Sequence, residues 1–328
     1  MALTDRRSYH VPYKDVARHC YRGLLDLKWH LRALVKEQSK SDYLNFLKAK
    51  GSRFQVVEVN DYCMKIDLND NVITPNLFLY GCWEPYESQL MTKLLRPGMT
   101  VVDVGAHVGY YSLLAAQVVG PTGRVVSFEP SPDNFALLTE NIKLNQLSQT
   151  IHAENAALAA QPGEADLFLS THNTGDHRIY STLRDDDEMF NAGAPRGSVR
   201  VPVVSLDDYL SRQGVSQVDM IKIDVQGAEM GVLSGMKQTL LHSPNLLLFT
   251  EFWPHGLLRF GTEPQAVLSF LADEVGLTLF HILPKERRVV PIEPASFALQ
   301  TRDIDPTEQI DLLGCPSPSP GLLEALDL

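Results

Sequence analysis

The chain has 328 residues, of which 44% are hydrophobic and 21% charged, with a formal net charge of −11. This length allows one large domain with an appendage, or two small domains. The acidic balance and the lack of any Lys/Arg run disfavour a nucleic-acid partner. No apolar run approaches membrane-spanning length, no apolar core follows the basic N-terminus, and no C-x-x-C pair occurs, so we expect a cytoplasmic protein without a membrane partner.

The first 80 residues are predicted to form a small α+β cap. Helical spacing of apolar residues indicates an amphipathic helix over 16–36 and a short one over 43–47. Alternation over 54–59 and 62–68 predicts a β-hairpin around Asn60–Asp61, and 77–80 would add a strand. We expect this cap to cover the core or a partner subunit; the alternative is that it covers a substrate pocket.

The central motif is a strand, a glycine turn and a helix. The apolar run 99–104 predicts a buried parallel strand, and Gly105 and Gly109 follow it before helical spacing begins. Dinucleotide sites need a glycine where this chain has His107, so a pyrophosphate fits poorly. Asp103 would repel phosphate but could support an ammonium group. The alternative is a glycine turn that binds nothing.

The next two strands suggest the ligand. The strand over 124–128 ends in Glu129, an acid placed to accept both hydroxyls of a ribose. Asn155 follows the strand over 150–153, where it could meet an adenine edge. A nucleoside with a cationic amino-acid tail satisfies these features together, and S-adenosylmethionine (SAM) is such a ligand. Between the two strands, Ser131 is the expected N-cap of a helix.

A long polar loop over 170–198 follows a predicted edge strand at 166–169. Loops of this length in compact domains are usually functional or disordered. The loop carries His177, which is either a titratable site residue or an exposed side chain without a role. Its acidic run over 185–188 is predicted to be solvated surface.

A second chemical stretch surrounds Asp224. The strand over 218–224 carries Lys222 in an otherwise apolar run, and a buried lysine needs a carboxylate partner on its own face. Asp224 satisfies that spacing at the carboxyl end of the strand, where open α/β sheets bind ligands. The strand over 245–250 ends in Glu251. If the two strands are neighbours, Asp224 and Glu251 could face one pocket beside the methyl group of SAM.

The remaining chain predicts a helix over 265–275 and a closing hairpin of 277–283 with 288–292. A tail over 301–328 follows, in which the proline-rich segment 315–321 is expected to be an extended arm. We therefore expect a cap over 1–80, a catalytic domain over 81–300 and this tail.

At this point the sequence resembles the FkbM family of SAM-dependent methyltransferases. The resemblance rests on segments in the family's order: 83–87, 103–111, 128–130, 141–145, 173–175, 222–229 and 251–252. It implies a class I methyltransferase (Rossmann-like) α/β fold, with a seven-stranded, mostly parallel sheet, a last antiparallel strand and helices on both faces. It also implies methyl transfer to a hydroxyl of a sugar or polyketide-type small molecule. Two departures are His107, where the family usually has Asn, and Gln226, where it usually has Glu.

The predicted SAM site combines the motif residues with the resemblance. Its members are Glu87, Asp103, Gly105, His107, Gly109, Tyr110, Glu129, Asn155 and Asp224. By the resemblance, Asp103, Gly105 and Gly109 match the cofactor loop and Glu129 the ribose-binding acid.

An alcohol is a poor nucleophile until its proton leaves, so a base or a metal must assist the transfer. We expect Asp224 to take or orient that proton, with Lys222 and Glu251 setting its charge state and His177 as the second candidate base. In a variant, Asp224 and Glu251 share a divalent cation, for which Mg²⁺ is suited.

Other functions compete with this one. An N- or C-methyltransferase on the same fold and a non-catalytic SAM-binding protein both stay open, and His107 disfavours a nicotinamide oxidoreductase. The sequence is also compatible with a homo-oligomer.

Overall fold

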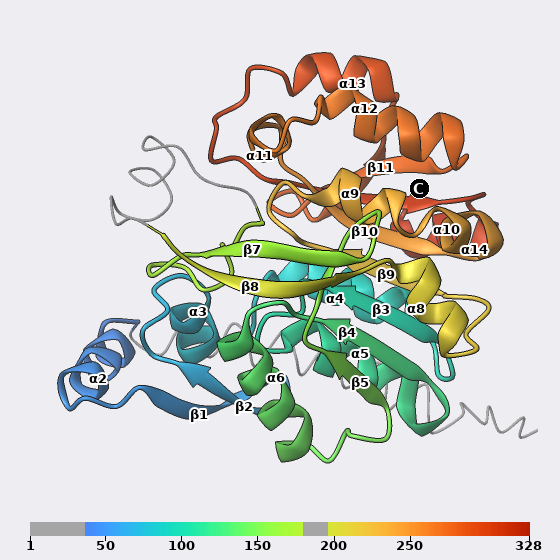
Figure 1. Cartoon of the computed structure of the whole chain (residues 1–328). Coiled ribbons are helices and arrows are strands. Elements are labelled where there is room, and N and C mark those ends of the chain that lie inside the picture. Colours follow the sequence, from blue (N-terminus) through green and yellow to red (C-terminus); the bar gives the residue numbers. More distant parts are fainter. Residues whose placement is uncertain (1–36, 180–195) are drawn as a thin grey trace, which may run out of the picture.

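A computed structural model describes residues 37–179 and 196–328 and centres on a twisted sheet (Figure 1). Its strand order is β12-β11-β13-β10-β9-β3-β4-β5. The strands are β3 (Thr100–Val104), β4 (Arg124–Phe128), β5 (Ile151–Glu154), β9 (Met220–Ile223), β10 (Leu247–Phe252), β11 (Thr278–Leu283), β12 (Arg288–Pro291) and β13 (Ile310–Cys315). The five strands from β5 to β10 pair in parallel, whereas β13 is antiparallel to both β10 and β11.

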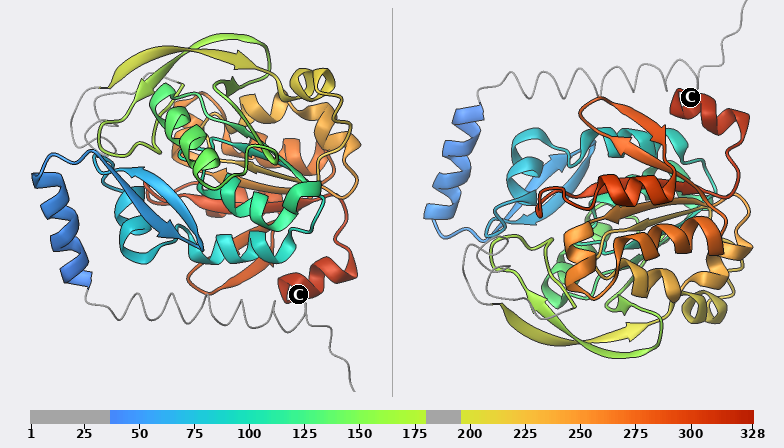
Figure 2. Two further views of the ribbon diagram at one scale, coloured as in Figure 1. Left: turned by 90° about the horizontal axis from the view of Figure 1, so that it is seen from below. Right: turned by 90° about the horizontal axis from the view of Figure 1, so that it is seen from above.

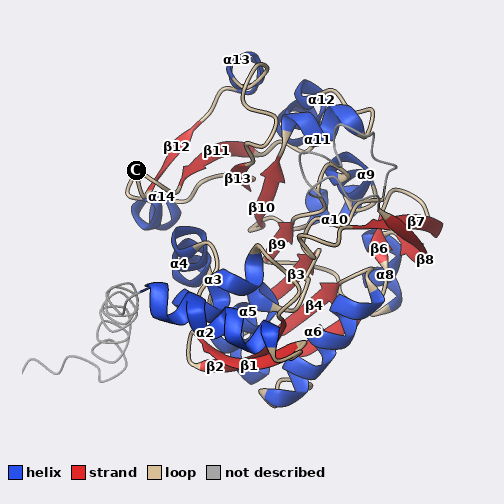
Figure 3. Ribbon diagram, turned by 90° about the vertical axis from the view of Figure 1, so that its left-hand side faces the viewer, coloured by secondary structure: helices blue, strands red, loops and turns tan. Residues whose placement is uncertain are grey.

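Helices cover both faces of this sheet (Figure 3). Along β3, Val101 belongs to one buried apolar cluster, and Val102 and Val104 to the other, as the two-residue period of a strand requires. The helices are α4 (Pro85–Leu94), α5 (Tyr110–Val119), α6 (Pro132–Leu144), α8 (Leu206–Arg212), α9 (Glu229–Ser234), α10 (Lys237–His242), α11 (Pro254–Arg259), α12 (Pro264–Ser269), α13 (Pro294–Gln300) and α14 (Pro320–Leu326). This arrangement confirms the class I methyltransferase fold.

The region before the sheet forms a cap at one end of the molecule (Figure 2). It holds α2 (Glu37–Ala49), a hairpin of β1 (Phe54–Val59) and β2 (Tyr62–Asp67), and α3 (Ile73–Tyr80). Asn60 and Asp61 both have positive φ, as a tight hairpin turn requires. The side-chain amides of Asn141 on α6 and of Asn145, which caps that helix, bond to the backbone of β2 at Lys65 and Cys63 and so fasten the cap to the core.

A second sheet follows β5, in the order β6 (Ala157–Leu158), β8 (Gly197–Val204) and β7 (Gly163–Leu169). The strand expected at 166–169 is therefore longer and lies outside the central sheet. Among the described helices, none has both the length and the apolar character that a bilayer crossing requires.

Three further expectations need correction. Segment 77–80 is helical, because Asp70 accepts the Thr74 N–H at the start of α3 and Gly81 ends the helix in the left-handed conformation. The central sheet has eight strands in the described chain rather than seven, since β12 adds an edge strand. The segment 315–321, which was expected to be an extended arm, instead connects β13 to α14. β13 itself lies inside the central sheet.

Two predicted features, the helix over 16–36 and the acidic run over 185–188, lie outside the described residues.

Candidate functional site

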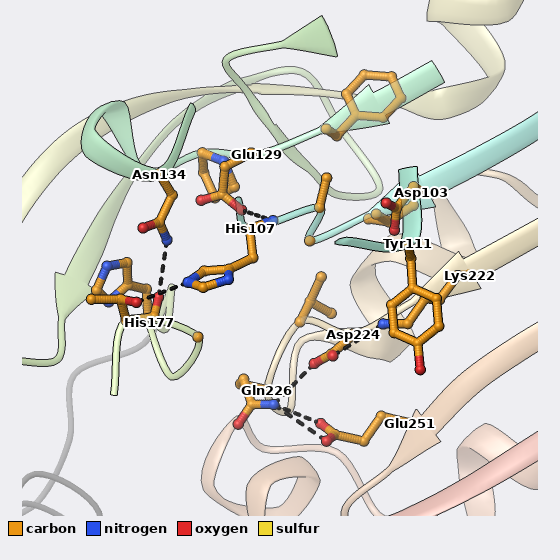
Figure 4. Close-up of a pocket in the computed structure, with 18 of the residues that line it drawn as sticks. Asp103, His107, Tyr111, Glu129, Asn134, His177, Lys222, Asp224, Gln226 and Glu251 are labelled. Carbon is orange, nitrogen blue, oxygen red and sulfur yellow. Dashed lines mark hydrogen bonds and ion pairs between the residues drawn. The ribbon is translucent and has the colours of Figure 1, made fainter. Parts of the chain in front are cut away.

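The carboxyl ends of β3, β4, β9 and β10 surround one cavity (Figure 4). Its volume is about 170 Å³. Val72 and Ile73 of the cap also line it, as in the alternative that places the cap over a substrate pocket. The charged and hydrogen-bonding side chains of its wall include Glu84, Asp103, His107, Glu129, Asn134, His177, Lys222, Asp224, Gln226, Glu251 and Gln309.

The turn after β3 requires glycine at two positions. Gly105 has a φ of +81°, and a Cβ there would lie 1.9 Å from the carbonyl oxygen of Asp224. Gly109 has a φ of +95°, and its Cβ would lie 2.6 Å from Leu138 Cδ1. Left-handed φ values carry little cost in glycine alone. The turn therefore packs directly against the end of β9 and leaves the cavity open above both strands.

Glu129 is held by the backbone at the end of β4. Its Oε2 accepts the His107 N–H at 2.8 Å, and its Oε1 accepts the Ser131 N–H at 2.9 Å. Burial nevertheless raises the pKa of Glu129 to about 7. His107 has a φ of 51°, and its Nε2 lies 2.8 Å from Thr174 Oγ1. The side chain of His107 thus connects the glycine turn to the 173–177 segment.

Asp103 is 1% exposed and lies at the end of β3. Its Oδ2 accepts the Ser112 hydroxyl at 2.5 Å, whereas its buried Oδ1 has no hydrogen-bond partner within residues 37–179 and 196–328. Burial raises the pKa of Asp103. An unpartnered buried carboxylate oxygen is costly, so it favours a ligand that donates a hydrogen bond or carries positive charge.

Lys222 and Asp224 form the ion pair that their spacing predicts, with Nζ 3.1 Å from Oδ2 and side chains 12% and 31% exposed. The ammonium also lies 4.5 Å from the ring centre of Tyr111. Burial acts against the charged lysine, but Asp224, Glu84 and Asp103 together raise its pKa above the ordinary value. Burial likewise acts against the charged Asp224, yet Lys222 and a Gln226 hydrogen bond lower its pKa. Asp224 is therefore ionised at neutral pH.

β9 and β10 are parallel neighbours, and Gln226 lies between the acids at their ends (Figure 4). Gln226 Nε2 lies 3.0 Å from Asp224 Oδ1, and 3.2 and 3.1 Å from the two carboxylate oxygens of Glu251. Burial, with the charges of Asp224 and Glu229, raises the pKa of Glu251 well above its ordinary value.

The shared Mg²⁺ considered from the sequence does not fit this arrangement. A cation needs oxygen lone pairs, but the Gln226 amide presents hydrogens to both Asp224 and Glu251. Its own oxygen accepts instead from Gln309 Nε2 at 3.0 Å. In the described parts of the chain, no group of three or more His, Cys, Asp or Glu residues is placed to hold a metal.

His177 lines the opposite side of the cavity. Its Nδ1 accepts the Ser170 N–H at 3.0 Å, and burial lowers the pKa of the imidazole to about 3. A neutral imidazole whose Nδ1 accepts must carry its proton on Nε2. His177 therefore offers a hydrogen-bond donor rather than a base.

Four predicted residues lie differently from the rest, and one of them, Gly109, shapes the turn without lining either cavity. Glu87 lines a smaller adjoining cavity instead of the main one. Asn155 does not line the main cavity and donates to the carbonyls of Glu129 and Pro130. Tyr110 lines the cavity, but its hydroxyl contacts Asn60 and Ser88.

Sequence reasoning missed Glu84, which lines both cavities. Its backbone is left-handed (φ 43°) just before α4, and its Oε2 accepts the Tyr111 hydroxyl at 2.5 Å. Burial raises the pKa of Glu84 to about 7. Pro85 immediately after it marks a helix start and was the available signal. Gln309 was also missed, and no local pattern identifies it.

Comparison with known proteins gives the family. Residues 103–276, more than half of the chain, match the methyltransferase FkbM domain. The chain belongs to the FkbM methyltransferase family.

Three named proteins that are similar to this chain share less than a third of its aligned residues. Methyltransferase sdnD of Sordaria araneosa is 26% identical over 160 residues, which cover 42% of this chain and 60% of that protein. 2-O-methyltransferase NoeI of Sinorhizobium fredii is 27% identical over 195 residues, covering 56% and 75%. 31-O-demethyl-FK506 methyltransferase FkbM of Streptomyces tacrolimicus is 29% identical over 162 residues, covering 44% and 61%. The chain thus spans less than two thirds of the length of sdnD and FkbM.

Proposed function

We propose that this chain is a SAM-dependent methyltransferase that methylates a hydroxyl oxygen of a small molecule. The observation that carries the proposal is a set of three carboxylates, the buried Asp103 and Glu129 and the partly buried Asp224, which end three neighbouring strands around one cavity. When bound, SAM supplies a methyl group activated by its sulfonium. The protein must then hold the cofactor, align the acceptor and remove a proton.

The residues present fit SAM. The unpartnered Oδ1 of Asp103 is suited to the cofactor's ammonium group. Each oxygen of Glu129 accepts one backbone N–H and keeps lone-pair capacity for a ribose hydroxyl. The close approach of Gly105 to Asp224 brings the cofactor turn beside the proposed base. These contacts support the assignment of Asp103, Gly105 and Glu129 to the cofactor.

We assign proton removal to Asp224. It is held ionised by Lys222 and Gln226, and it lines the cavity at the end of β9. Glu251 beside it has a raised pKa, which favours its protonated form. His177 is the weaker candidate, because its Nδ1 already accepts a backbone N–H. In this assignment His177 orients the acceptor or cofactor as a donor.

Oxygen as the methylated atom is supported by the names of relatives and by the site. NoeI is named a 2-O-methyltransferase, FkbM acts on 31-O-demethyl-FK506, and AglP of Haloferax volcanii, 24% identical over 172 residues, is named a hexuronic acid methyltransferase. An ionised carboxylate is needed more by an alcohol than by an amine, since a neutral amine nitrogen is already a good nucleophile whereas a neutral hydroxyl oxygen is a poor one. A hydroxylated sugar or polyketide is therefore the acceptor class to screen first.

Titration calorimetry with SAM and S-adenosylhomocysteine tests the cofactor assignment. We expect both to bind the wild-type protein, and Asp103→Ala and Glu129→Ala to weaken binding strongly. Glu164→Ala is the matched control, because its exposed side chain pairs only at the surface with Arg200. Transfer of a labelled methyl group to hydroxylated and amino acceptors then separates O- from N-methylation. If neither SAM nor S-adenosylhomocysteine binds the wild-type protein, the proposal is refuted.

A further inference from the structure

Two side-chain amides continue from the Asp224–Glu251 pair toward the protein surface. Gln309 Nε2 donates to Gln226 Oε1 at 3.0 Å, and Gln226 Nε2 donates to both acids. We propose that Gln309 and Gln226 form a two-amide relay that orients the Asp224 carboxylate and divides the charge of the Asp224–Glu251 pair unequally. Its part in methyl transfer rests on the proposed function, whereas its effect on the two acids does not.

The unequal division follows from the number of donors. The Gln226 amide has two hydrogens and faces three carboxylate oxygens at 3.0 to 3.2 Å. One hydrogen goes to Asp224 Oδ1, whose companion Oδ2 is held by the Lys222 ammonium. The other is shared by both oxygens of Glu251. Asp224 thus receives two separate donors, one of them charged, and is the acid that stays ionised.

The two acids and Gln309 together fix which way the Gln226 amide points. Reversing Gln226 would turn its oxygen toward two acids and its NH₂ toward the Gln309 donor, which is unfavourable at both ends. The register of β13 on β10 places Gln309 for this contact, because Ile310 pairs with Phe252. Gln226 has a φ of 56°, an uncommon conformation for a residue other than glycine, asparagine or aspartate. Backbone and partner therefore both fix this side chain.

Most of the titratable groups around Asp224 oppose its ionised form, so the hydrogen bond from Gln226 matters for its charge. Besides Lys222 and Glu251, the titratable groups whose charge reaches Asp224 are Glu84, Asp103, His107, Glu229 and Asp311. Four of these five are acids, so they oppose the ionised form of Asp224. Lys222, the Gln226 amide and, as the smallest of the three, His107 favour it. Loss of the amide should therefore move the Asp224 titration upward.

Carbon-13 NMR of the aspartate carboxyls tests the relay without turnover, with Asp224→Asn to assign the signal. We expect Gln226→Leu to raise the Asp224 titration midpoint by about one pH unit, the effect of one charge-assisted hydrogen bond. Gln309→Leu should shift it in the same direction by less, and Gln309 is exposed, so this variant is expected to fold. Gln265→Leu is the control, since the exposed Gln265 bonds to Ser269 within its own helix, α12. An unchanged midpoint in both Gln226→Leu and Gln309→Leu would overturn the relay.

The catalytic part is read from the pH profile of kcat/KM for the methyl acceptor. The acid limb should move to higher pH in the order Gln309→Leu, then Gln226→Leu, while the KM for SAM stays constant. An acid limb that stays in place while the NMR midpoint moves shows that the relay is not used in catalysis. A wild-type protein without any methyl transfer would count against the proposed function, while the NMR result still decides the relay.

Discussion

Gly105 and Asp224 lie in direct backbone contact, although 119 positions separate them in the chain, because β3 and β9 are adjacent parallel strands. The missing side chain at Gly105 is what allows the carbonyl oxygen of Asp224 to approach. The proposed cofactor turn and the proposed base are thus one packed unit. Displacing either of them should disturb the other.

Gly105→Ala should therefore lower the free energy of unfolding by more than backbone strain alone would. Gly261 has nearly the same φ, +82°, but nothing within 4 Å of its hypothetical Cβ. Gly261→Ala should lower the free energy of unfolding by about 1–2 kcal/mol, the cost of a left-handed non-glycine residue. Gly105→Ala should lower it by about 2 kcal/mol more and abolish SAM binding. Urea denaturation and calorimetry measure both, and equal effects of the two substitutions would contradict the contact.

Asp224→Asn keeps the shape of the side chain and removes its charge. If Asp224 is the base, kcat should fall about 10²–10⁴-fold, while the Kd for SAM changes only a few-fold. Asp166→Asn is the control, because Asp166 is half exposed on β7 and pairs with Arg200. Thermal unfolding of each variant separates loss of chemistry from loss of fold. If Asp224→Asn keeps the wild-type kcat, a group other than Asp224 removes the proton.

Glu129 gives the protein a pH-dependent stability before the cofactor binds. Burial raises the pKa of Glu129 to about 7 from an ordinary 4.5, so the folded state holds this proton more tightly than the unfolded chain. The cost of ionising it is absent below pH 4.5 and fully present above pH 7. From this group alone, the free energy of unfolding falls as pH rises through that window, by up to about 3 kcal/mol.

Glu129→Gln should therefore reduce the difference in stability between pH 5 and pH 7.5. Chemical denaturation of the cofactor-free protein at the two pH values measures it. Part of the slope will persist, since burial also raises the pKa of Glu84 and Glu229 to about 7. The exposed Glu164→Gln should leave the slope unchanged. The same slope in Glu129→Gln as in the wild type would contradict a raised pKa at Glu129.

The strand ends were predictable because buried parallel strands are short apolar runs. Asp103, Glu129, Asp224 and Glu251 interrupt or follow such runs, and the parallel order then brings them to one edge of the sheet. The ion pair of Lys222 with Asp224 followed from the same reasoning, since a buried ammonium needs a partner on its own face.

What sequence reasoning missed depends on contacts between distant segments. Gln309 reaches Gln226 only because β13 inserts between β10 and β11, which no local pattern reveals. The tautomer of His177 depends on a backbone N–H seven residues away. Residues 77–80 were misjudged because an apolar run of four fits a strand or a helix equally, and Asp70 decides the outcome through Thr74.

The position of β13 has a consequence for the domain limits. Removal of residues 309–328 would take out a strand that bonds to β10 on one side and β11 on the other, including the fully buried Leu312 and Leu313. We propose that this segment is part of the catalytic domain, and expect the truncated protein to be insoluble or unfolded by circular dichroism. Removal of 320–328 takes out only α14, with the buried Leu326, and should cost about 2–3 kcal/mol while leaving a folded protein. A soluble, cooperatively unfolding protein that ends at residue 308 would show that the sheet does not need β13.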